Sequence, residues 1–205
     1  MQSLSAVKLN LYEQIGYLMT GAVAVTLVLW DFQLADAAKA FPQIDLGQSV
    51  LVFIGAYVAG HFAQVLSNYV VPYPKKSFSN LEKQILKRVR EYLSLTCSDD
   101  ETMGFTMMLA QTSDTTGQVG AFNANYGLYR GWSVIFLCQA IVMAVISVLH
   151  PSVWSAPWGQ IELECMAEAS AAVSWLFLKR AMRFNRYYRS KVFQTATIKL
   201  ATEDH

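Results

Sequence analysis

The stretch from Gln48 to Asn68 is long and apolar enough to cross a bilayer, and this property constrains the fold more than any other feature of the chain. It also contains Tyr57, His61, Gln64 and Asn68, whose spacing places them in one stripe along a helix. Hydrocarbon offers such side chains no partner, so the stripe should face other helices or a wet cavity. The sequence therefore predicts a central span of a helical bundle.

A set of small residues lies on the flank of this stripe. Gly55 and Ala59 form one pair spaced four residues apart, and Ala56 and Gly60 form another. Small residues at this spacing let a neighbouring backbone approach closely. We therefore expect another helix to pack against this stretch.

The composition extends the prediction to the whole chain, because 54% of its residues are hydrophobic and its mean hydropathy is +0.28. Such values are too high for an ordinary soluble domain. Four spans are predicted, at about residues 11–31, 49–71, 131–150 and 161–182. The predicted fold class is all-α: one polytopic membrane domain with four transmembrane helices, a small helical cytosolic cap in residues 72–130 and a basic cytosolic tail in residues 183–205.

Two of these spans have alternative interpretations. The first apolar run could be a cleaved signal peptide, since Ala35–Ala40 resembles a small-residue cleavage site, but the run is longer than the apolar region of a usual signal peptide. The fourth span is the least apolar, because it contains Glu162, Glu164 and Glu168. Three spans would leave the basic tail outside the cell, so four are favoured.

The lysine and arginine residues define the orientation. Seven lie in residues 72–130 and seven in residues 179–199, whereas the connection 31–49 has Lys39 alone and the connection 151–160 has none. Basic residues collect on the cytoplasmic side of membrane proteins. This asymmetry predicts that both termini and the 72–130 segment lie in the cytoplasm.

Two capping patterns predict helices in the 72–130 segment. Ser79 is followed by Glu82 at the third position, and Ser98 is followed in the same way by Glu101. The first pattern opens an amphipathic helix over about Asn80–Leu95, and the second opens a short helix rich in methionine. The end of the segment is expected to form an interfacial helix that leads into the third span.

Several polar residues lie near the cytoplasmic side in this topology. His61, Gln64 and Asn68 occupy the cytoplasmic half of the second span. At the same level the first span begins with Glu13 and the third with Arg130, and Glu13 is the expected partner of Arg130. In one interpretation these residues hydrogen-bond between helices and fix the bundle. In the other they form the cytoplasmic mouth of a pore or a small-ligand site.

Glu168 lies about two turns below the outer surface on the predicted fourth span. Glu162 and Glu164 are nearer the interface and are expected to be solvated. A carboxyl at the depth of Glu168 is either neutral and hydrogen-bonded or exposed to a water-filled lumen. It therefore indicates a proton- or cation-linked role, or a hydrogen bond between subunits.

The sequence has no signature of an enzyme, a cofactor site or a metal site. It contains no Ser-His or Cys-His pairing with supporting spacing, no phosphate-binding glycine loop and no HExxH motif. Cys97, Cys138 and Cys165 include no CxxC pair, so neither a disulfide framework nor a zinc site is predicted. A role for His61 as a metal or haem ligand is disfavoured, because neither other histidine lies at a matching depth.

The basic tail is expected to continue the fourth helix and to bind lipid headgroups or a protein. Its cations alternate with aromatic residues, a pattern that nucleic-acid-binding segments share, but anionic headgroups beside a bilayer explain it more simply. A cytosolic protein is the other expected partner, docking on the tail and on the methionine-rich segment. The expected contact residues are Arg183, Arg186, Arg189 and Lys191.

Three segments carry a likeness to other sequences: YVAGHFAQVLSN from Tyr57, FNANYGLYRGWSVIFL from Phe122 and RFNRYYRSKVF from Arg183. In this order they resemble a loosely defined group of uncharacterised bacterial four-span inner-membrane proteins. Some proteins of this architecture look like membrane subunits of anti-phage systems that act with a cytosolic partner, so the resemblance implies such a role. The positions matched are Gly60, His61, Ser67, Tyr126, Gly127 and Arg130.

Together these inferences predict a non-enzymatic inner-membrane component that forms a homo-oligomer and senses or permeabilises the membrane with a cytosolic partner. The alternative is a small channel or transporter subunit for ions or a metabolite. A membrane enzyme using His61 and Glu168 is disfavoured, because the two residues lie at different depths.

Overall fold

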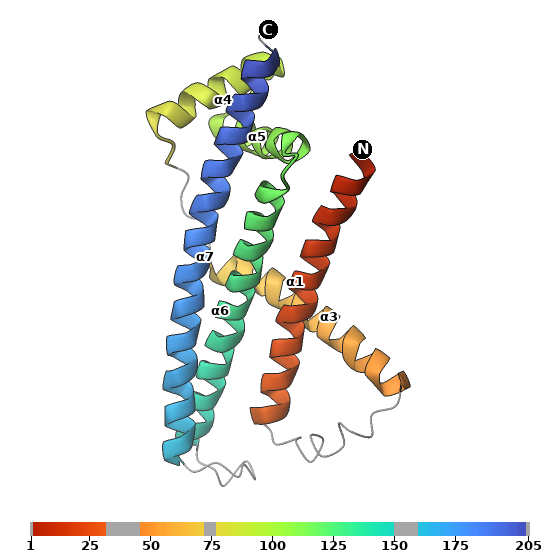
Figure 1. Cartoon of the computed structure of the whole chain (residues 1–205). Helices are drawn as coiled ribbons and strands as arrows, with labels where there is room; N and C mark the ends of the chain where they lie inside the picture. The colour runs from red at the N-terminus through yellow and green to blue at the C-terminus, as the bar shows by residue number, and fades with distance from the viewer. Residues whose placement is uncertain (1, 32–45, 72–76, 150–159, 204–205) are drawn as a thin grey trace. The chain divides into compact units, whose positions relative to one another are not determined.

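The computed structural model describes residues 2–31, 46–71, 77–149 and 160–203. All regular structure within these ranges is helical, so the all-α prediction is confirmed. Figure 1 shows six described helices: α1 (Gln2–Asp31), α3 (Leu46–Val70), α4 (Asn80–Tyr92), α5 (Asp99–Ser113), α6 (Gln118–Leu149) and α7 (Gln160–Glu203).

The helices α6 and α7 are longer than one membrane span requires. The expected interfacial helix and third span form one continuous helix, α6, with 32 residues. The tail continues the helix of the expected fourth span, as predicted, and α7 reaches 44 residues. No proline or glycine interrupts the sequence of α7, which removes the two strongest helix breakers.

The contacts of the chain divide it into two compact units. Unit 1 comprises Met1–Tyr12, Tyr73–Tyr126 and Met182–His205, and unit 2 comprises Glu13–Pro72 and Gly127–Ala181. Unit 1 thus combines the capped helices with the basic tail, and unit 2 contains the apolar segments.

Unit 2 consists of two helix pairs. In Figure 1, α3 crosses α1, and α6 lies beside α7 in the antiparallel direction. The α6–α7 pair buries Met143, Ile146 and Leu163 together. Polar side chains also join these two helices, through hydrogen bonds from Ser174 Oγ to the Ser133 carbonyl (2.7 Å), from Ser170 Oγ to Gln139 Oε1 (2.9 Å) and from Ser147 Oγ to Glu164 Oε1 (3.3 Å).

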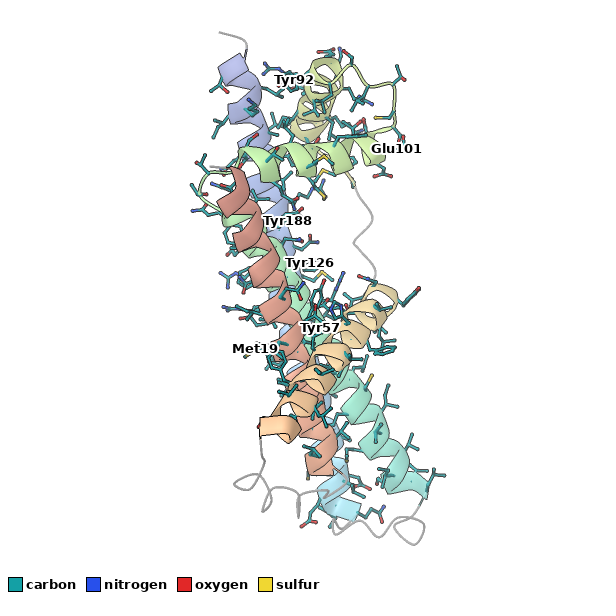
Figure 2. The ribbon with its side chains drawn as sticks, turned by 90° about the vertical axis from the view of Figure 1, so that its right-hand side faces the viewer. Met19, Tyr57, Tyr92, Glu101, Tyr126 and Tyr188 are labelled. Carbon is teal, nitrogen blue, oxygen red and sulfur yellow. The ribbon has the colours of Figure 1, made fainter. Side chains whose placement is uncertain are left out.

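Unit 1 is built around the two predicted capping boxes, both of which are present at Ser79 and Ser98. The helix α4 ends at Tyr92 rather than near Leu95, because Ser94 adopts a left-handed φ of 51° that a right-handed helix cannot continue through. The core residues come from four helices, and Tyr188 among them is labelled in Figure 2. This core contains Leu86, Met103, Ala110, Val119, Tyr188, Val192 and Phe193.

The turn between α5 and α6 is held by one carboxylate. Asp114 accepts hydrogen bonds from Thr116 N (3.0 Å) and from Val119 N (2.6 Å), the latter within the first turn of α6. Gly117 completes the turn with φ of 71°, a conformation that glycine adopts without steric cost. Partial burial would raise the pKa of Asp114, but these hydrogen bonds and nearby Lys191 lower it below its usual range.

Two described helical segments are long and apolar enough to cross a membrane. They are Ser49–Val70 and Gln118–Leu149, whose most apolar 18-residue stretches have mean hydropathies of 1.7 and 2.4. The apolar part of α1 within the described residues, Gln14–Leu29, is shorter. Length and composition thus support two spans and do not by themselves establish four.

Candidate functional site

The candidate site lies in unit 2, where α1, α3 and α6 meet, and we call it the polar junction. It is defined by Tyr17, Thr20, Tyr57, His61, Gln64 and Arg130. Two glycines allow the close approach of α1 and α3 at this site. A Cβ atom on Gly21 would overlap the Ala56 carbonyl, and one on Gly60 would overlap the Tyr17 carbonyl. The predicted Ala56–Gly60 pair is therefore a packing face, and the crossing tolerates no side chain at Gly60.

Gly55 of the second predicted small pair does not pack against another helix. Gly55 is exposed, and a Cβ atom placed on it would meet no atom within 4 Å. Ala59 is half-buried. The face that packs instead continues from Ala56 and Gly60 to Ala63 and Ser67, which are buried at successive helical turns.

Three aromatic rings form the first layer of the polar junction. His61 stacks on Tyr17, with ring centroids 4.1 Å apart, and meets Tyr57 edge-on, with centroids 4.6 Å apart. The Tyr57 hydroxyl, labelled in Figure 2 where α3 crosses α1, donates a hydrogen bond to Gln14 Oε1. His61 and Tyr57 are half-buried, so the stripe predicted from the sequence does contact a neighbouring helix.

Gln64 forms the second layer and connects α3 to α6. Its Nε2 donates a hydrogen bond to the Gly127 carbonyl at 2.8 Å. Gly131, one turn further along α6, lies against the side chains of Gln64 and Thr20. A Cβ atom on Gly131 would come unusually close to Thr20 and Gln64, so a small residue at this position allows the approach of α6.

Arg130 is buried in the same part of α6, with only 6% of its surface exposed. A guanidinium group within an apolar bundle remains charged and is retained only where hydrogen bonds compensate for lost water. The side chain of Glu13, its expected partner, lies outside the described residues, so that pairing stays a prediction. A buried cation of this kind could also bind an anionic ligand.

Two of the predicted site residues lie away from the polar junction. Asn68 continues the stripe by sequence but is exposed. Glu168 is exposed on α7, on the side opposite Ser170 and Ser174, which face α6. The structure thus brings His61 and Gln64 together with α1 and α6 and leaves Asn68 and Glu168 outside.

The sequence prediction missed the partners in this junction and between α6 and α7. Gln14 and Tyr17 carry no signal in the sequence, and only their contacts with α3 give them a role. A sequence signal does exist for Ser170 and Ser174, because two small polar residues four apart in an apolar helix indicate an interhelical contact.

The described side chains suggest no metal centre. No group of three or more His, Cys, Asp or Glu residues within the described ranges could hold a metal ion. The contacts observed in the polar junction are hydrogen bonding through Gln64 and Tyr57 and aromatic stacking of His61.

Unit 1 contains a separate surface feature, a groove of about 750 Å³ between α4 and α7. Arg189 and Glu82 both line the groove and pair with each other. The Arg189 Nε donates to Glu82 Oε1 at 2.7 Å, and its Nη2 donates to Glu82 Oε2 at 2.9 Å. Partial burial opposes ionisation of Glu82, but hydrogen bonds from Arg189 and Ser79 outweigh it and lower the pKa of Glu82. Leu81 and Ile198 also line the groove, and both are two-thirds exposed.

The predicted contact residues of the tail divide into two kinds. Arg183 and Arg186 are exposed, and Arg186 lines the groove. Arg189 is instead paired with Glu82, and Lys191 is half-buried near Asp114. The first two are available to a partner, whereas the last two stabilise unit 1.

No protein family, curated protein or solved structure matches this chain. The resemblance to bacterial four-span proteins therefore stays a prediction from its three segments.

Proposed function

We propose that the protein is a non-enzymatic component of the bacterial inner membrane, with unit 2 embedded in the bilayer and unit 1 in the cytoplasm. The distribution of side chains on α3 carries this proposal. Its largest apolar residues point away from the protein, with Leu51 70% and Phe62 73% exposed. Its polar residues His61 and Gln64 contact protein instead. In a soluble protein the apolar side of a helix is buried and its polar side is exposed. The side chains of α3 have the opposite distribution, which suits a lipid environment.

The helix α6 supports the same conclusion. Only 17% of the most apolar window of α3 and 33% of that of α6 are buried. A core helix of a soluble protein would be mostly buried, because water disfavours a large apolar surface. Val148 at the end of α6 is 82% exposed and adds to this apolar surface.

Two further observations favour four crossings over two. Apolar side chains are exposed on the other two helices as well, including Val28 on α1 and Trp175 and Leu176 on α7. The basic residues concentrate in the tail and in residues 72–130, which four crossings place on one side. Both termini are then cytoplasmic.

Aromatic and basic residues mark the proposed cytoplasmic interface of unit 2. The Lys179 ammonium lies 3.5 Å from the Trp175 ring centroid, and the Arg180 guanidinium lies 5.5 Å from the Tyr129 ring centroid. Trp132 packs close by, edge-on against Phe177. Tyr, Trp and basic side chains favour the headgroup level, where an apolar body and a polar tip are both satisfied.

The proposed role is to sense or permeabilise the membrane together with a cytosolic protein, as in anti-phage defence. The groove of unit 1 supports a partner that presents apolar side chains beside acidic ones, because Leu81 and Ile198 are exposed next to Arg186. On α5, Phe105 and Met108 add a second exposed apolar pair.

A small channel or transporter subunit is the second candidate function. The burial of Arg130 in the polar junction favours it, because a fixed cation in an apolar bundle can select an anionic ligand. The candidates differ in phenotype. A permeabilising component should be toxic when overproduced, and Arg130→Ala should relieve the toxicity at unchanged protein level, whereas a transporter should give substrate-dependent growth.

The native cysteines test the membrane placement. Single-cysteine variants that keep only Cys97 in unit 1 or only Cys138 on α6 are treated in intact cells with a maleimide that cannot cross membranes. We expect Cys97 to react only after permeabilisation, and Cys138, although exposed on its helix, to react only after denaturation. A Lys39→Cys variant without native cysteines should react in intact cells. Labelling of Cys97 in intact cells would overturn the orientation, and recovery of the protein in the soluble fraction would overturn the membrane assignment.

A further inference from the structure

The helix α7 presents a face that no described residue covers. Cys165, Ala169, Ala172 and Leu176 follow one another at helical spacing, and all four are exposed. Glu168 lies on the same face and is also exposed. The buried side of α7, with Ser170 and Ser174, points the other way, toward α6. With respect to the described residues, this outer face of α7 is open to another molecule.

Glu168 makes the composition of this face unsuitable for lipid. The inference rests on the proposed function, which places this part of α7 in the bilayer. Glu164, one turn earlier, shares hydrogen bonds with Ser147 (3.3 Å) and Gln160 (3.1 Å). Within the described part of the chain Glu168 has no such partner. A carboxyl group at membrane depth faces protein or water rather than hydrocarbon, because hydrocarbon cannot replace its hydration.

We propose that a second copy of this chain covers the outer face of α7 and that the two Glu168 side chains hydrogen-bond to each other. Two copies inserted in the same orientation place their Glu168 residues at the same depth. A two-fold contact requires a self-complementary surface. A pair of carboxyl groups that shares a proton meets this requirement, since a protonated carboxyl donates and its partner accepts.

The small residues of the face allow the required approach. Ala169 and Ala172 flank Glu168 and leave room for a neighbouring backbone, as small residues do at transmembrane helix contacts. Cys165 occupies the same stripe one turn before Ala169. In a symmetric pair the two Cys165 thiols therefore come close together. Crosslinking of this native cysteine can then detect the pair.

Crosslinking of Cys165 in membranes tests the pair directly. One variant keeps only Cys165 and its control keeps only Cys138, which is also exposed but lies on α6. Each is treated in isolated membranes with a short, lipid-soluble bismaleimide, which adds one thiol at each end, after a lipid-soluble monomaleimide has shown that both thiols react there. We expect a crosslinked dimer with Cys165 and not with Cys138. Absence of the Cys165 dimer, or equal dimer from both cysteines, would overturn the proposal.

Substitutions in the Cys165-only chain test the contact itself. Glu168→Leu should lower the dimer association constant by about 3- to 30-fold, the range that interhelical hydrogen bonds in membranes correspond to. Glu168→Gln should retain association, because an amide also donates and accepts. Ala172→Leu should block the approach, whereas Ala144→Leu on the exposed side of α6 should not. Unchanged crosslinking in both Glu168→Leu and Ala172→Leu would overturn the contact.

The outcomes separate the inference from the proposed function. Each membrane sample is also extracted with alkaline carbonate before crosslinking. Protein that stays in the membrane without a Cys165 dimer overturns the pairing alone. Protein that is released into the soluble fraction overturns the membrane placement on which both depend.

Discussion

Gly21 of α1 and Gly60 of α3 lie backbone to backbone where the two helices cross. Because a Cβ atom at position 60 would overlap the Tyr17 carbonyl, we expect Gly60→Leu to separate α1 from α3. Overpacking of this kind costs about 1–3 kcal/mol of stability. The measurement is the apparent melting temperature of the detergent-purified protein, followed by size-exclusion chromatography after heating.

Gly55 provides the matched control on the same helix. Nothing lies within 4 Å of a Cβ atom at that position, so Gly55→Ala should leave the crossing intact. It should raise stability by up to about 1 kcal/mol, because alanine loses less backbone entropy in a helix than glycine. If Gly60→Leu and Gly55→Ala melt at the same temperature, the two helices do not cross at Gly60.

Gln64→Leu should weaken the junction of α3 with α6. The substitution removes the 2.8 Å hydrogen bond to the Gly127 carbonyl while keeping a side chain of similar size. Interhelical hydrogen bonds in membranes contribute about 0.6–2 kcal/mol, so a small decrease in the apparent melting temperature is expected. Asn68→Leu is the control, since Asn68 is exposed and its loss should change stability by less than about 0.5 kcal/mol. Equal effects of the two substitutions would contradict the assignment of Gln64 to the junction.

The helices could be predicted from the sequence because their signals are local. The capping boxes at Ser79 and Ser98 need only residues three positions apart, and both are formed. That the predicted cap and tail join in one unit could not be predicted in the same way. It depends on whether α4 and α5 bury their apolar sides against α6 and α7, as Leu86 and Val192 do in one core. Such contacts join residues far apart in the sequence.

The candidate site could be predicted only in part for the same reason. The spacing of His61 and Gln64 predicts a helix face that contacts other helices, and both residues do contact a neighbouring helix. The spacing does not identify those partners, Tyr17 and the Gly127 carbonyl, because helix crossing determines them. Asn68 has the same spacing but lies beyond the crossing and stays exposed. Periodicity thus predicts which residues share the face, and the position of the helix crossing determines which of them contact another helix.

Arg189→Ala should destabilise unit 1 by about 1.5–3 kcal/mol, the range for hydrogen bonds to charged groups. Arg189 makes two hydrogen bonds to Glu82, and both side chains are less than one-third exposed, so solvent screens the pair only weakly. Hydrogen exchange of the α4 amides measures the loss as faster exchange. Lys87→Ala is the control, because the Lys87–Glu91 pair is 3.8 Å apart and largely exposed. Comparable protection in the two variants would show that the Arg189–Glu82 contact does not hold α4.

Acid should loosen the same contact through Glu82. The pKa of Glu82 is lowered in the folded protein, so the folded state favours the ionised carboxyl more than the unfolded state does. The resulting stability is fully present above the ordinary glutamate pKa of about 4.3 and is lost as the pH falls through the lower folded value. Hydrogen exchange of α4, corrected for the intrinsic rate, should therefore accelerate below roughly pH 4.3.

Glu82→Gln isolates this contribution from the other carboxylates. The amide can accept from Arg189 but carries no charge, so the variant should be less stable than the native chain near neutral pH. Its α4 exchange should also depend less on pH in the acidic range. The Asp114 turn, whose pKa is lowered as well, remains in the variant and should leave a residual pH dependence at the start of α6. An unchanged pH dependence of α4 in Glu82→Gln would mean that acid acts on unit 1 elsewhere than at the Arg189–Glu82 contact.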